Sequence, residues 1–420
     1  SLAAAGKIVG TRDVTAERLL PDQPQFTRVL EHDAIPYVSY PYEWPFPLLQ
    51  SAALLHLDIQ LEALAKGVAL SDATAYNVQF RGPTPVFIDI LSFRPYRPGE
   101  LWPAHRQFCE QFLNPLLLQS LFGFPHNAWY RGALEGIDTE AIAALMPRKA
   151  WFSPRALFHV LLPARAQQRL PGTSEAKSVE RVRKAALPQE GYAMMLRQLR
   201  RWIAGLTPAR THLSTWEDYH KTRTYDDPEL NAKRAFVGEF AAATKPGMIW
   251  DIGCNDGEFL EIALKHGAGT AIGFDADQGA LLRAHQRATT HKINLLPLFQ
   301  DAVNPSPGQG WRNAERAAWL GRARPDAAMF LAVIHHVAIG RNVPLADAVA
   351  QLVGIAPKGV IEFVHKDDPT VVRMLALRED IFPDYHQAAF EAALTRHARI
   401  VKTQVVSRAK RQMYWFERFA

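Results

Sequence analysis

Ile249-Trp250-Asp251-Ile252-Gly253-Cys254-Asn255-Asp256-Gly257-Glu258-Phe259 is the stretch that decides the fold of this chain. It reads as an apolar strand, a turn with the spacing Asp-x-Gly-x-x-x-Gly, and the start of a helix. Gly253 and Gly257 let the backbone approach a ligand with no side chain in the way, and Asn255 tolerates a left-handed conformation better than most residues. The pattern predicts a loop that contacts a ligand at the end of a strand.

Strand-like and helical segments alternate from Gly247 onward. This alternation predicts right-handed crossovers and a mostly parallel sheet with helices on both faces. The fold class is therefore α/β and Rossmann-like. The expected strands are 248–252, 271–274, 293–298, 327–333 and 360–364, and the expected helices are 259–265 and 280–288.

An acidic residue stands near the carboxyl end of each of the first three expected strands. Asp251 leads the turn, Asp275 stands 24 positions later, and Asp301 follows the apolar run 293–299. A dinucleotide fingerprint would need G-x-G-x-x-G, which is absent here, and a leading carboxylate suits a cationic ligand without phosphate. Asp275 lies where such folds hold ribose hydroxyls.

The turn together with Asp275 and Asp301 resembles the donor-binding motifs of class I S-adenosylmethionine-dependent methyltransferases. The resemblance implies a seven-stranded sheet, S-adenosyl-L-methionine as cofactor and S-adenosyl-L-homocysteine as product. It implies that the turn approaches the methionine part of the donor, that Asp275 takes the ribose and that Asp301 reaches the adenine amine. The donor-binding residues of the turn are then Asp251, Gly253, Cys254, Asn255 and Gly257, with Asn255 in place of the family's middle glycine.

A lid over the donor is expected just before the first strand. Two segments there, 216–220 and 233–237, carry Tyr219 and Lys233. Both side chains are candidates for contact with the carboxylate of the methionine part, against plain packing or surface roles.

His335 and His336 directly follow the expected strand 327–333. Ligands of open α/β sheets bind outside the carboxyl ends of the strands, so this pair should face the site. A hydroxyl acceptor must lose its proton during methyl transfer, and imidazole titrates near neutral pH. The pattern predicts O-methylation with a histidine base, His335 being favoured, while Glu362 and His365 at the end of the next strand orient the base or the acceptor.

A second resemblance lies in the N-terminal part. Asp72 and Asn77 stand five residues apart and Asp89 follows twelve residues later, which resembles the catalytic Asp, the metal-binding Asn and the second metal-binding Asp of protein-kinase-like phosphotransferases. The His or Arg that usually stands directly before the catalytic Asp is absent at Asp72. No strand lysine with a Gly-rich loop ahead of it is found either. The alternatives are a bifunctional or degenerate kinase–methyltransferase acting on a bacterial saccharide, and an unrelated turn.

Much of the chain is also similar to a bacterial methyltransferase family known through rhizobial nodulation proteins, which implies a glycan or specialised-metabolite acceptor. Tyr42 and Trp44 belong to an aromatic stretch that suits a sugar or a flat metabolite, although packing explains it equally well. A non-catalytic protein that binds the donor and docks a partner is a further alternative. The stretches that carry the resemblance are 39–44, 77–80, 333–336 and 339–344.

Length and composition fit a folded protein of several domains. The chain has 420 residues, of which 48% are hydrophobic and 21% charged, with a net charge of +6. We expect an α+β domain over 1–150 that shapes the acceptor site, with a degenerate kinase-like domain as the alternative for it. A basic helical connector and lid is expected over 151–235, and the methyltransferase domain over 236–420.

The remaining expectations concern metals, partners and location. Cys109 and Cys254 are the only cysteines and lack the paired spacing of zinc sites, so no metal is expected. The modest charge and the lack of a recognised module argue against nucleic acid, and no window resembles a signal peptide or a membrane span. The sequence predicts a cytoplasmic enzyme with a small-molecule or glycan acceptor.

Overall fold

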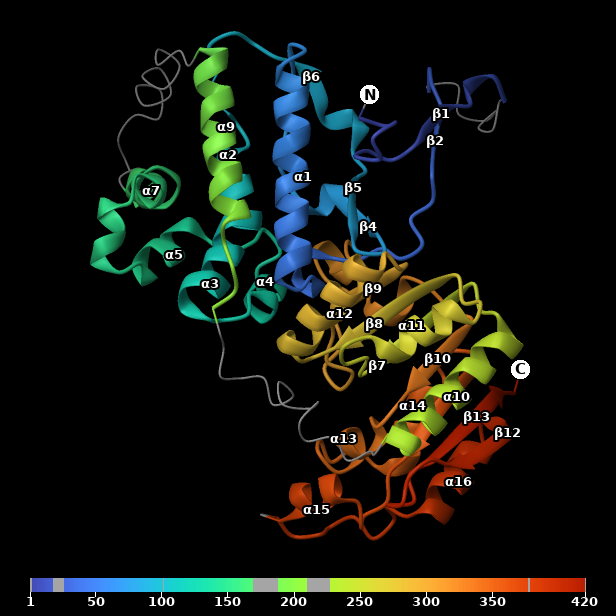
Figure 1. Ribbon diagram of the computed structural model, residues 1–420. Coiled ribbons are helices and arrows are strands. Elements are labelled where there is room, and N and C mark those ends of the chain that lie inside the picture. The colour runs from blue at the N-terminus through green and yellow to red at the C-terminus, as the bar shows by residue number, and fades with distance from the viewer. Residues whose placement is uncertain are drawn as a thin grey trace. The chain divides into compact units, whose positions relative to one another are not determined.

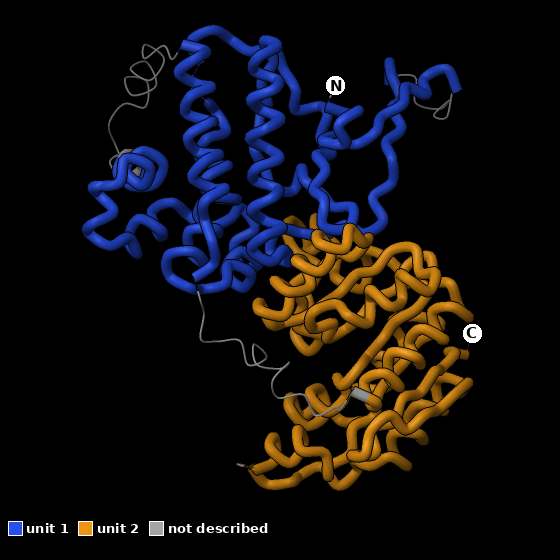
Figure 2. Tube along the Cα trace, viewed as in Figure 1, with its two compact units in different colours: residues 1–211 blue, residues 212–420 orange. Residues whose placement is uncertain are grey.

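The computed structural model describes residues 2–17, 26–100, 102–168, 188–209, 227–376 and 378–419. Contacts divide the chain into two compact units, residues 1–211 and residues 212–420 (Figure 2). The expected three-part division at 150 and 235 stays a prediction. Within the described residues, no helix combines the length and the apolar character needed to cross a lipid bilayer.

The second unit is built on a seven-stranded sheet with the order β12-β13-β11-β10-β7-β8-β9 (Figure 1). All pairs from β9 to β11 are parallel, and β13 runs antiparallel to both of its neighbours. This is the mostly parallel α/β sheet that the sequence predicted. Its strands are β7 (Met248–Ile252), β8 (Thr270–Asp275), β9 (Leu295–Phe299), β10 (Ala327–Phe330), β11 (Lys358–Phe363), β12 (Ala398–Val405) and β13 (Gln412–Arg418).

Helices and short helical turns connect these strands. The chain leaves β7 toward β8 and β9 on one side and then returns to β10 on the other side of β7. The strand order therefore reverses between β7 and β10, which is where open α/β sheets bind ligands. The connecting elements are α10 (Asp227–Thr244), α11 (Glu258–Lys265), α12 (Gln278–His291), η8 (Trp311–Asn313), η9 (Trp319–Gly321), α13 (Ile334–Ala338), α14 (Leu345–Val353), α15 (Pro369–Leu375) and α16 (Gln387–Thr395).

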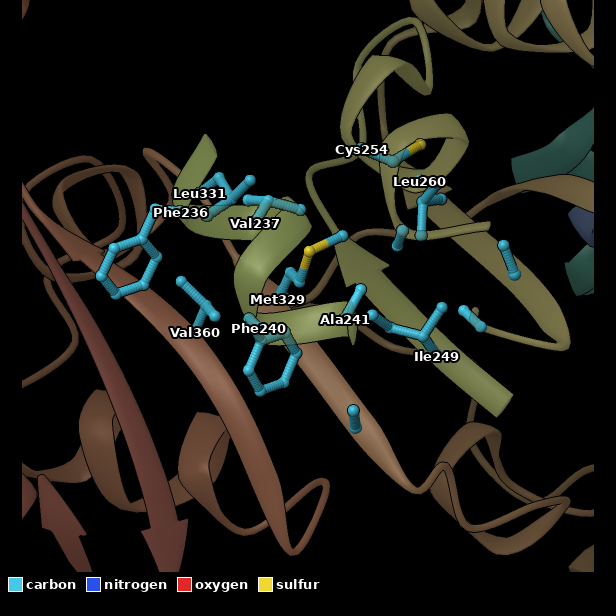
Figure 3. Close-up of a cluster of buried hydrophobic side chains, with 14 of the residues drawn as sticks. Phe236, Val237, Phe240, Ala241, Ile249, Cys254, Leu260, Met329, Leu331 and Val360 are labelled. Atoms are coloured by element: carbon cyan, nitrogen blue, oxygen red, sulfur yellow. The ribbon is translucent and has the colours of Figure 1, made fainter. Parts of the chain in front are cut away.

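Both faces of the sheet are covered. On one face, Phe236 and Phe240 of α10 point toward Ile249, Met329 and Val360 of three strands, and all five side chains are buried (Figure 3). The next residue along β7, Trp250, points to the opposite face because strand side chains alternate. There its ring stacks on that of Trp319, 5.9 Å away between centroids. Two apolar faces explain the near-continuous hydrophobic runs of β7 and β10.

The expected strand 327–333 is too long. The structure ends β10 at Phe330, and Ala332 adopts a left-handed conformation with φ of 56°. Extended pairing cannot continue through that conformation. The chain enters α13 two residues later, so His335 and His336 lie on a short helix rather than directly on a strand end.

The first unit combines helices with two-stranded sheets. Its longest helices, α1 and α9, pack side by side (Figure 1), and Gln60 of α1 donates a hydrogen bond of 2.8 Å to the hydroxyl of Tyr192 of α9. β4 and β5 form an antiparallel hairpin, in which Val78 pairs with Phe87. The elements up to β6 are β1 (Thr11–Asp13), η1 (Thr15–Glu17), β2 (Leu30–His32), η2 (Pro41–Glu43), α1 (Phe46–Leu64), β3 (Val68–Leu70), η3 (Ala75–Asn77), β4 (Val78–Arg81), β5 (Thr84–Phe87), η4 (Ile90–Ser92) and β6 (Phe93–Pro95).

The rest of the first unit is helical. Pro188 is the N-cap of α9. The helical elements are α2 (His105–Phe108), η5 (Cys109–Leu113), α3 (Asn114–Phe122), α4 (Asn127–Gly132), α5 (Thr139–Leu145), η6 (Arg148–Phe152), α6 (Pro154–Ala156), η7 (Leu157–Leu161), α7 (Leu162–Gln168) and α9 (Gln189–Ala204).

Candidate functional site

A cavity of about 360 Å³ opens in the second unit, at the carboxyl ends of β7, β8 and β10. Its volume lies within the range of small-molecule sites, which is about 300–1,000 Å³. Eight of the residues singled out in the sequence line it: Lys233, Asp251, Gly253, Cys254, Asn255, Asp275, Asp301 and His336. Residues from four strand ends thus meet at the point where the strand order reverses.

The turn after β7 has the backbone that its glycines predict. Gly253 and Gly257 have φ of 78° and 77°, and Asn255 also lies in the left-handed region with φ of 49°. A Cβ on Gly253 would lie 2.7 Å from the side chain of Val333. Its amide donates to the carbonyl of Phe274 at 2.8 Å, which ties the turn to β8. The positive φ angles of these three residues set the path of the turn.

Asp275 closes the turn from the end of β8. Its carboxylate accepts hydrogen bonds from the amide of Asn255 at 2.9 Å and from that of Asp277 at 2.8 Å. Burial raises the pKa of Asp275 to about 6, and these backbone donors counteract part of that effect. The side chain is therefore an ordered acceptor on the cavity wall.

Asp251 and Lys233 bring opposite charges to the same wall. Asp251 is 1% exposed, and its Oδ1 has no hydrogen-bond partner among the described residues. Burial raises the pKa of Asp251 well above its usual range, and the ammonium of Lys233 lowers it. Lys233, from α10, is 3% exposed. A buried acceptor without a partner beside a buried cation favours a polar ligand that carries its own donors and an acid group.

Asp301 lies after β9 and forms an ion pair with Arg341. The two side chains are 2.8 Å apart, and Arg341 also lines the cavity. The backbone amide of Val303 donates to the other Asp301 oxygen at 2.9 Å. Arg341 was not among the expected site residues. Its position in the stretch 339–344 was the available signal, but nothing local indicated that it would pair across 40 residues of chain.

The two histidines differ in their access to the cavity. His336 lines it, whereas His335 is 1% exposed and does not line it. Within the part of the chain that the structure describes, the Nδ1 of His335 has no hydrogen-bond partner. Their rings lie 4.1 Å apart between centroids. Burial lowers the pKa of His336 to about 4, and burial also lowers that of His335 well below its usual range. Both imidazoles are therefore neutral at pH 7.

Glu362 lies behind the cavity and not on its wall. Its carboxylate is fully buried and accepts a hydrogen bond of 2.6 Å from Lys233. On its other side stands Arg411, at 3.8 Å, which makes hydrogen bonds of 2.7 and 3.0 Å to Asp368. This buried network holds the ammonium of Lys233 against Glu362. Arg411 and Asp368 had no distinguishing signal in the sequence.

The other expected residues lie elsewhere. Gly257 caps α11 and does not line the cavity, and His365 packs its ring edge-on against Phe363, 5.1 Å away. Tyr42 and Trp44 are buried in the first unit, at 1% and 0% exposure. Tyr219 lies outside the described residues. The roles of all these residues stay predictions.

The kinase-like spacing brings its three residues together in the first unit. The Nδ2 of Asn77 donates to Asp72 at 3.0 Å and to Asp89 at 3.1 Å. Asp89 also caps η4 by accepting a hydrogen bond from the amide of Leu91. Burial and then the charge of Asp89 raise the pKa of Asp72.

Comparison with known proteins identifies the family of this chain. It is 46% identical over 418 residues to nodulation protein NoeA of Rhizobium meliloti strain 1021, and the match covers 99% of this chain and 87% of NoeA. The chain belongs to the NoeA family of nodulation proteins. The similarity to rhizobial nodulation proteins that the sequence indicated is thereby confirmed. A scan against models of protein families finds no match.

Solved structures similar to this NoeA-family chain include two methyltransferases. The N-methyltransferase NodS from Bradyrhizobium japonicum WM9, in complex with S-adenosyl-L-homocysteine, is 14% identical, with a TM-score of 0.35 over 49% of this chain and 98% of NodS. Magnesium protoporphyrin IX methyltransferase from Synechocystis PCC 6803 is 16% identical, with a TM-score of 0.33 over 53% and 95%. Similarity at this level does not by itself identify a reaction.

Proposed function

We propose that this NoeA-family chain is an S-adenosylmethionine-dependent methyltransferase whose donor binds in the cavity between β7 and β10. The observation that carries the proposal is the turn Gly253–Gly257 closed by Asp275. A glycine backbone, an ordered carboxylate acceptor and a strand reversal coincide at one cavity.

The residues on the wall fit this donor in charge and in hydrogen bonding. Three carboxylates, of Asp251, Asp275 and Asp301, would repel a pyrophosphate but accept hydrogen bonds from ribose hydroxyls and an adenine amine. The Oδ1 of Asp251 has no hydrogen-bond partner among the described residues, and a hydroxyl or amine of the ligand would satisfy it. Lys233 supplies the cation that a methionine carboxylate needs.

The acceptor chemistry rests on His336. When bound, the donor supplies an electrophilic methyl group carried by a sulfonium. His336 lines the cavity and is neutral at pH 7, so its imidazole has a lone pair that can take the proton of an acceptor hydroxyl. Alignment of the acceptor by the cavity wall adds to the rate without any base. We therefore propose O-methylation of a small-molecule, specialised-metabolite or glycan acceptor, with His336 rather than His335 as the base.

Calorimetric titration with S-adenosyl-L-homocysteine and S-adenosyl-L-methionine tests the donor site. We expect saturable binding by the wild-type chain and loss of binding in Asp275→Ala and Gly253→Trp. Asp347→Ala, on the exposed face of α14, is the matched control and should bind like the wild type. Absence of binding to the folded wild type at millimolar ligand would exclude the methyltransferase proposal.

Transfer of a labelled methyl group to hydroxyl-bearing saccharides and metabolites then tests catalysis. Binding without transfer to any acceptor would favour the non-catalytic alternative, a donor-binding protein that docks a partner. Once an acceptor is found, His336→Ala should lower kcat by about 10²–10⁴-fold while donor affinity stays within a few-fold, because general base catalysis contributes on that order.

A second candidate function rests on the bridge that Asn77 makes between Asp72 and Asp89. The carboxylate of Asp89 and the amide oxygen of Asn77 are ligands that Mg²⁺ accepts, Asp72 takes the place of the catalytic Asp, and this trio occurs in kinase-like phosphotransferases. A bifunctional enzyme acting on a bacterial saccharide would hydrolyse or transfer from ATP in the presence of Mg²⁺, and Asp89→Ala would abolish this. No ATP binding by the wild-type chain with Mg²⁺ would leave the trio as a structural turn.

A further inference from the structure

Two histidines and a cysteine of the first unit converge where α2 and η5 meet η7. The Nε2 of His105 lies 2.9 Å from the Nδ1 of His159 and 3.6 Å from the Sγ of Cys109. One ligand atom from each residue lies within 4.8 Å of the other two. Three donor atoms therefore surround one point, although His159 stands 54 residues from His105.

The spacing of these atoms matches a transition-metal site. Zinc bonds of about 2.0–2.1 Å to nitrogen and about 2.3 Å to sulfur put tetrahedral neighbours about 3.3 Å apart for two nitrogens and about 3.6 Å apart for nitrogen and sulfur. The observed 3.6 Å between nitrogen and sulfur agrees with that geometry, whereas the two nitrogens, at 2.9 Å, lie about 0.4 Å closer together than it requires.

Local backbone structure brings the three residues into position. His105 and Cys109 stand four residues apart, so their side chains lie on the same face of the helix. Cys109 begins the π-helical turn η5, and His159 lies within a second π-helical turn, η7. Such turns are rare and occur often at functional sites. Two of them meet here.

The environment of the cluster is apolar and largely dry. Cys109 is 1% and His159 is 4% exposed, while His105 is half-buried. The ring of Trp102 lies edge-on to His105 at 5.7 Å, and Trp202 lies 6.1 Å from His159.

We propose that His105, Cys109 and His159 bind one divalent transition-metal ion of the zinc class in the first unit. Two nitrogens and one sulfur suit Zn²⁺ and its spectroscopic substitute Co²⁺ and disfavour Mg²⁺ and Ca²⁺, which prefer oxygen ligands. Three protein ligands leave a fourth position for water or an external ligand. The ion joins α2 and η5 to η7, so it cross-links segments that local sequence does not hold together.

Titration of the metal-free full-length chain with Co²⁺ tests this site. We expect one equivalent to bind, with a thiolate-to-cobalt charge-transfer band in the near ultraviolet and visible bands of tetrahedral cobalt, and Zn²⁺ should displace it. The chain has only two cysteines, which makes the assignment of the band direct. Cys109→Ala should abolish the band, and Cys254→Ala, the thiol control, should keep it.

Histidine variants extend the test. His159→Phe and His105→Phe should each weaken Zn²⁺ binding by at least about 100-fold, since even outer-shell changes at zinc sites cost about 10–100-fold. His56→Phe, another buried histidine of the same unit, should leave the affinity unchanged.

Circular dichroism of the metal-free proteins separates ligand loss from misfolding. The wild-type titration decides the proposal even if a variant misfolds. A folded wild-type chain that takes up no Co²⁺ or Zn²⁺ would overturn it, and so would a charge-transfer band that survives Cys109→Ala and disappears in Cys254→Ala.

Discussion

At the scale of single residues, the donor site depends on one carboxylate and one glycine. The pKa of Asp275 is raised to about 6, so in the empty site this group holds a proton below that pH and is an anion above it. Ribose hydroxyls donate to the anion. Donor binding should therefore be pH-independent above about pH 7 and should weaken by up to about tenfold per pH unit below 6.

Calorimetry with S-adenosyl-L-homocysteine between pH 5 and pH 8 checks this dependence. Asp275→Asn, which cannot titrate, should bind more weakly at pH 8 and lose the dependence below 6. The same decline in Asp275→Asn as in the wild type would assign the titration to another group.

Gly253 should tolerate no side chain. Its φ of 78° disfavours every residue with a Cβ, and an added Cβ would lie 2.7 Å from the side chain of Val333. We expect Gly253→Ala to lower the free energy of unfolding by about 1–3 kcal/mol and to weaken donor binding. Urea unfolding measures the first effect. Gly321→Ala is the control, because a Cβ there meets nothing within 4 Å; equal losses in both variants would refute the argument.

At the scale of elements, a buried ion network joins α10 to β11 and to the start of β13. Lys233 and Glu362 are 3% and 0% exposed, and neither charge has bulk water to stabilise it. Removing one partner leaves an uncompensated charge in a medium of low dielectric constant. Glu362→Gln should therefore destabilise the chain by about 3–5 kcal/mol in urea unfolding, although the two side chains have the same shape.

A surface pair of the same type gives the comparison. Lys402 and Glu239 form an ion pair whose side chains are 36% and 54% exposed. Since water and salt screen exposed pairs, Glu239→Gln should cost less than about 1 kcal/mol. Similar losses in Glu362→Gln and Glu239→Gln would mean that burial of the Lys233 pair has no energetic weight.

At the scale of the whole molecule, the donor should stabilise one unit of the chain. The cavity wall comes entirely from described residues between Leu230 and Arg341, in the second unit. A ligand at about 100 times its dissociation constant adds about 2.7 kcal/mol to the folded state that binds it. We expect S-adenosyl-L-homocysteine to slow amide hydrogen exchange at 251–259, 275–277 and 300–303.

Hydrogen exchange of the full-length chain, followed by mass spectrometry, gives the location of this protection. Peptides from residues 26–100 of the first unit should be unchanged, and Gly253→Trp should show no protection at any peptide. Protection centred on the first unit would move the donor site away from the cavity and contradict the proposed function.

Local sequence was sufficient to predict the turn and the sheet that form the backbone of the site. The turn 253–257 was predicted correctly because its glycines and Asn255 report a backbone with positive φ, which is a property of each residue and its neighbours. The alternation of apolar strands and amphipathic helices predicted the α/β sheet for the same reason, because the spacing of apolar residues along the chain distinguishes the two kinds of element. The family resemblance followed from these local motifs.

Only the tertiary structure decided which side chains meet at the cavity. His336 and not His335 lines it because Ala332 ends the strand early and a helix then turns consecutive residues to different sides. Arg341 reaches Asp301, and Lys233 reaches Glu362 across 129 residues, through the order of strands in the sheet. The cluster of His105, Cys109 and His159 is of the same kind. Sequence periodicity describes neighbours along the chain, whereas charges and ligand atoms pair through space once burial has removed water as their partner.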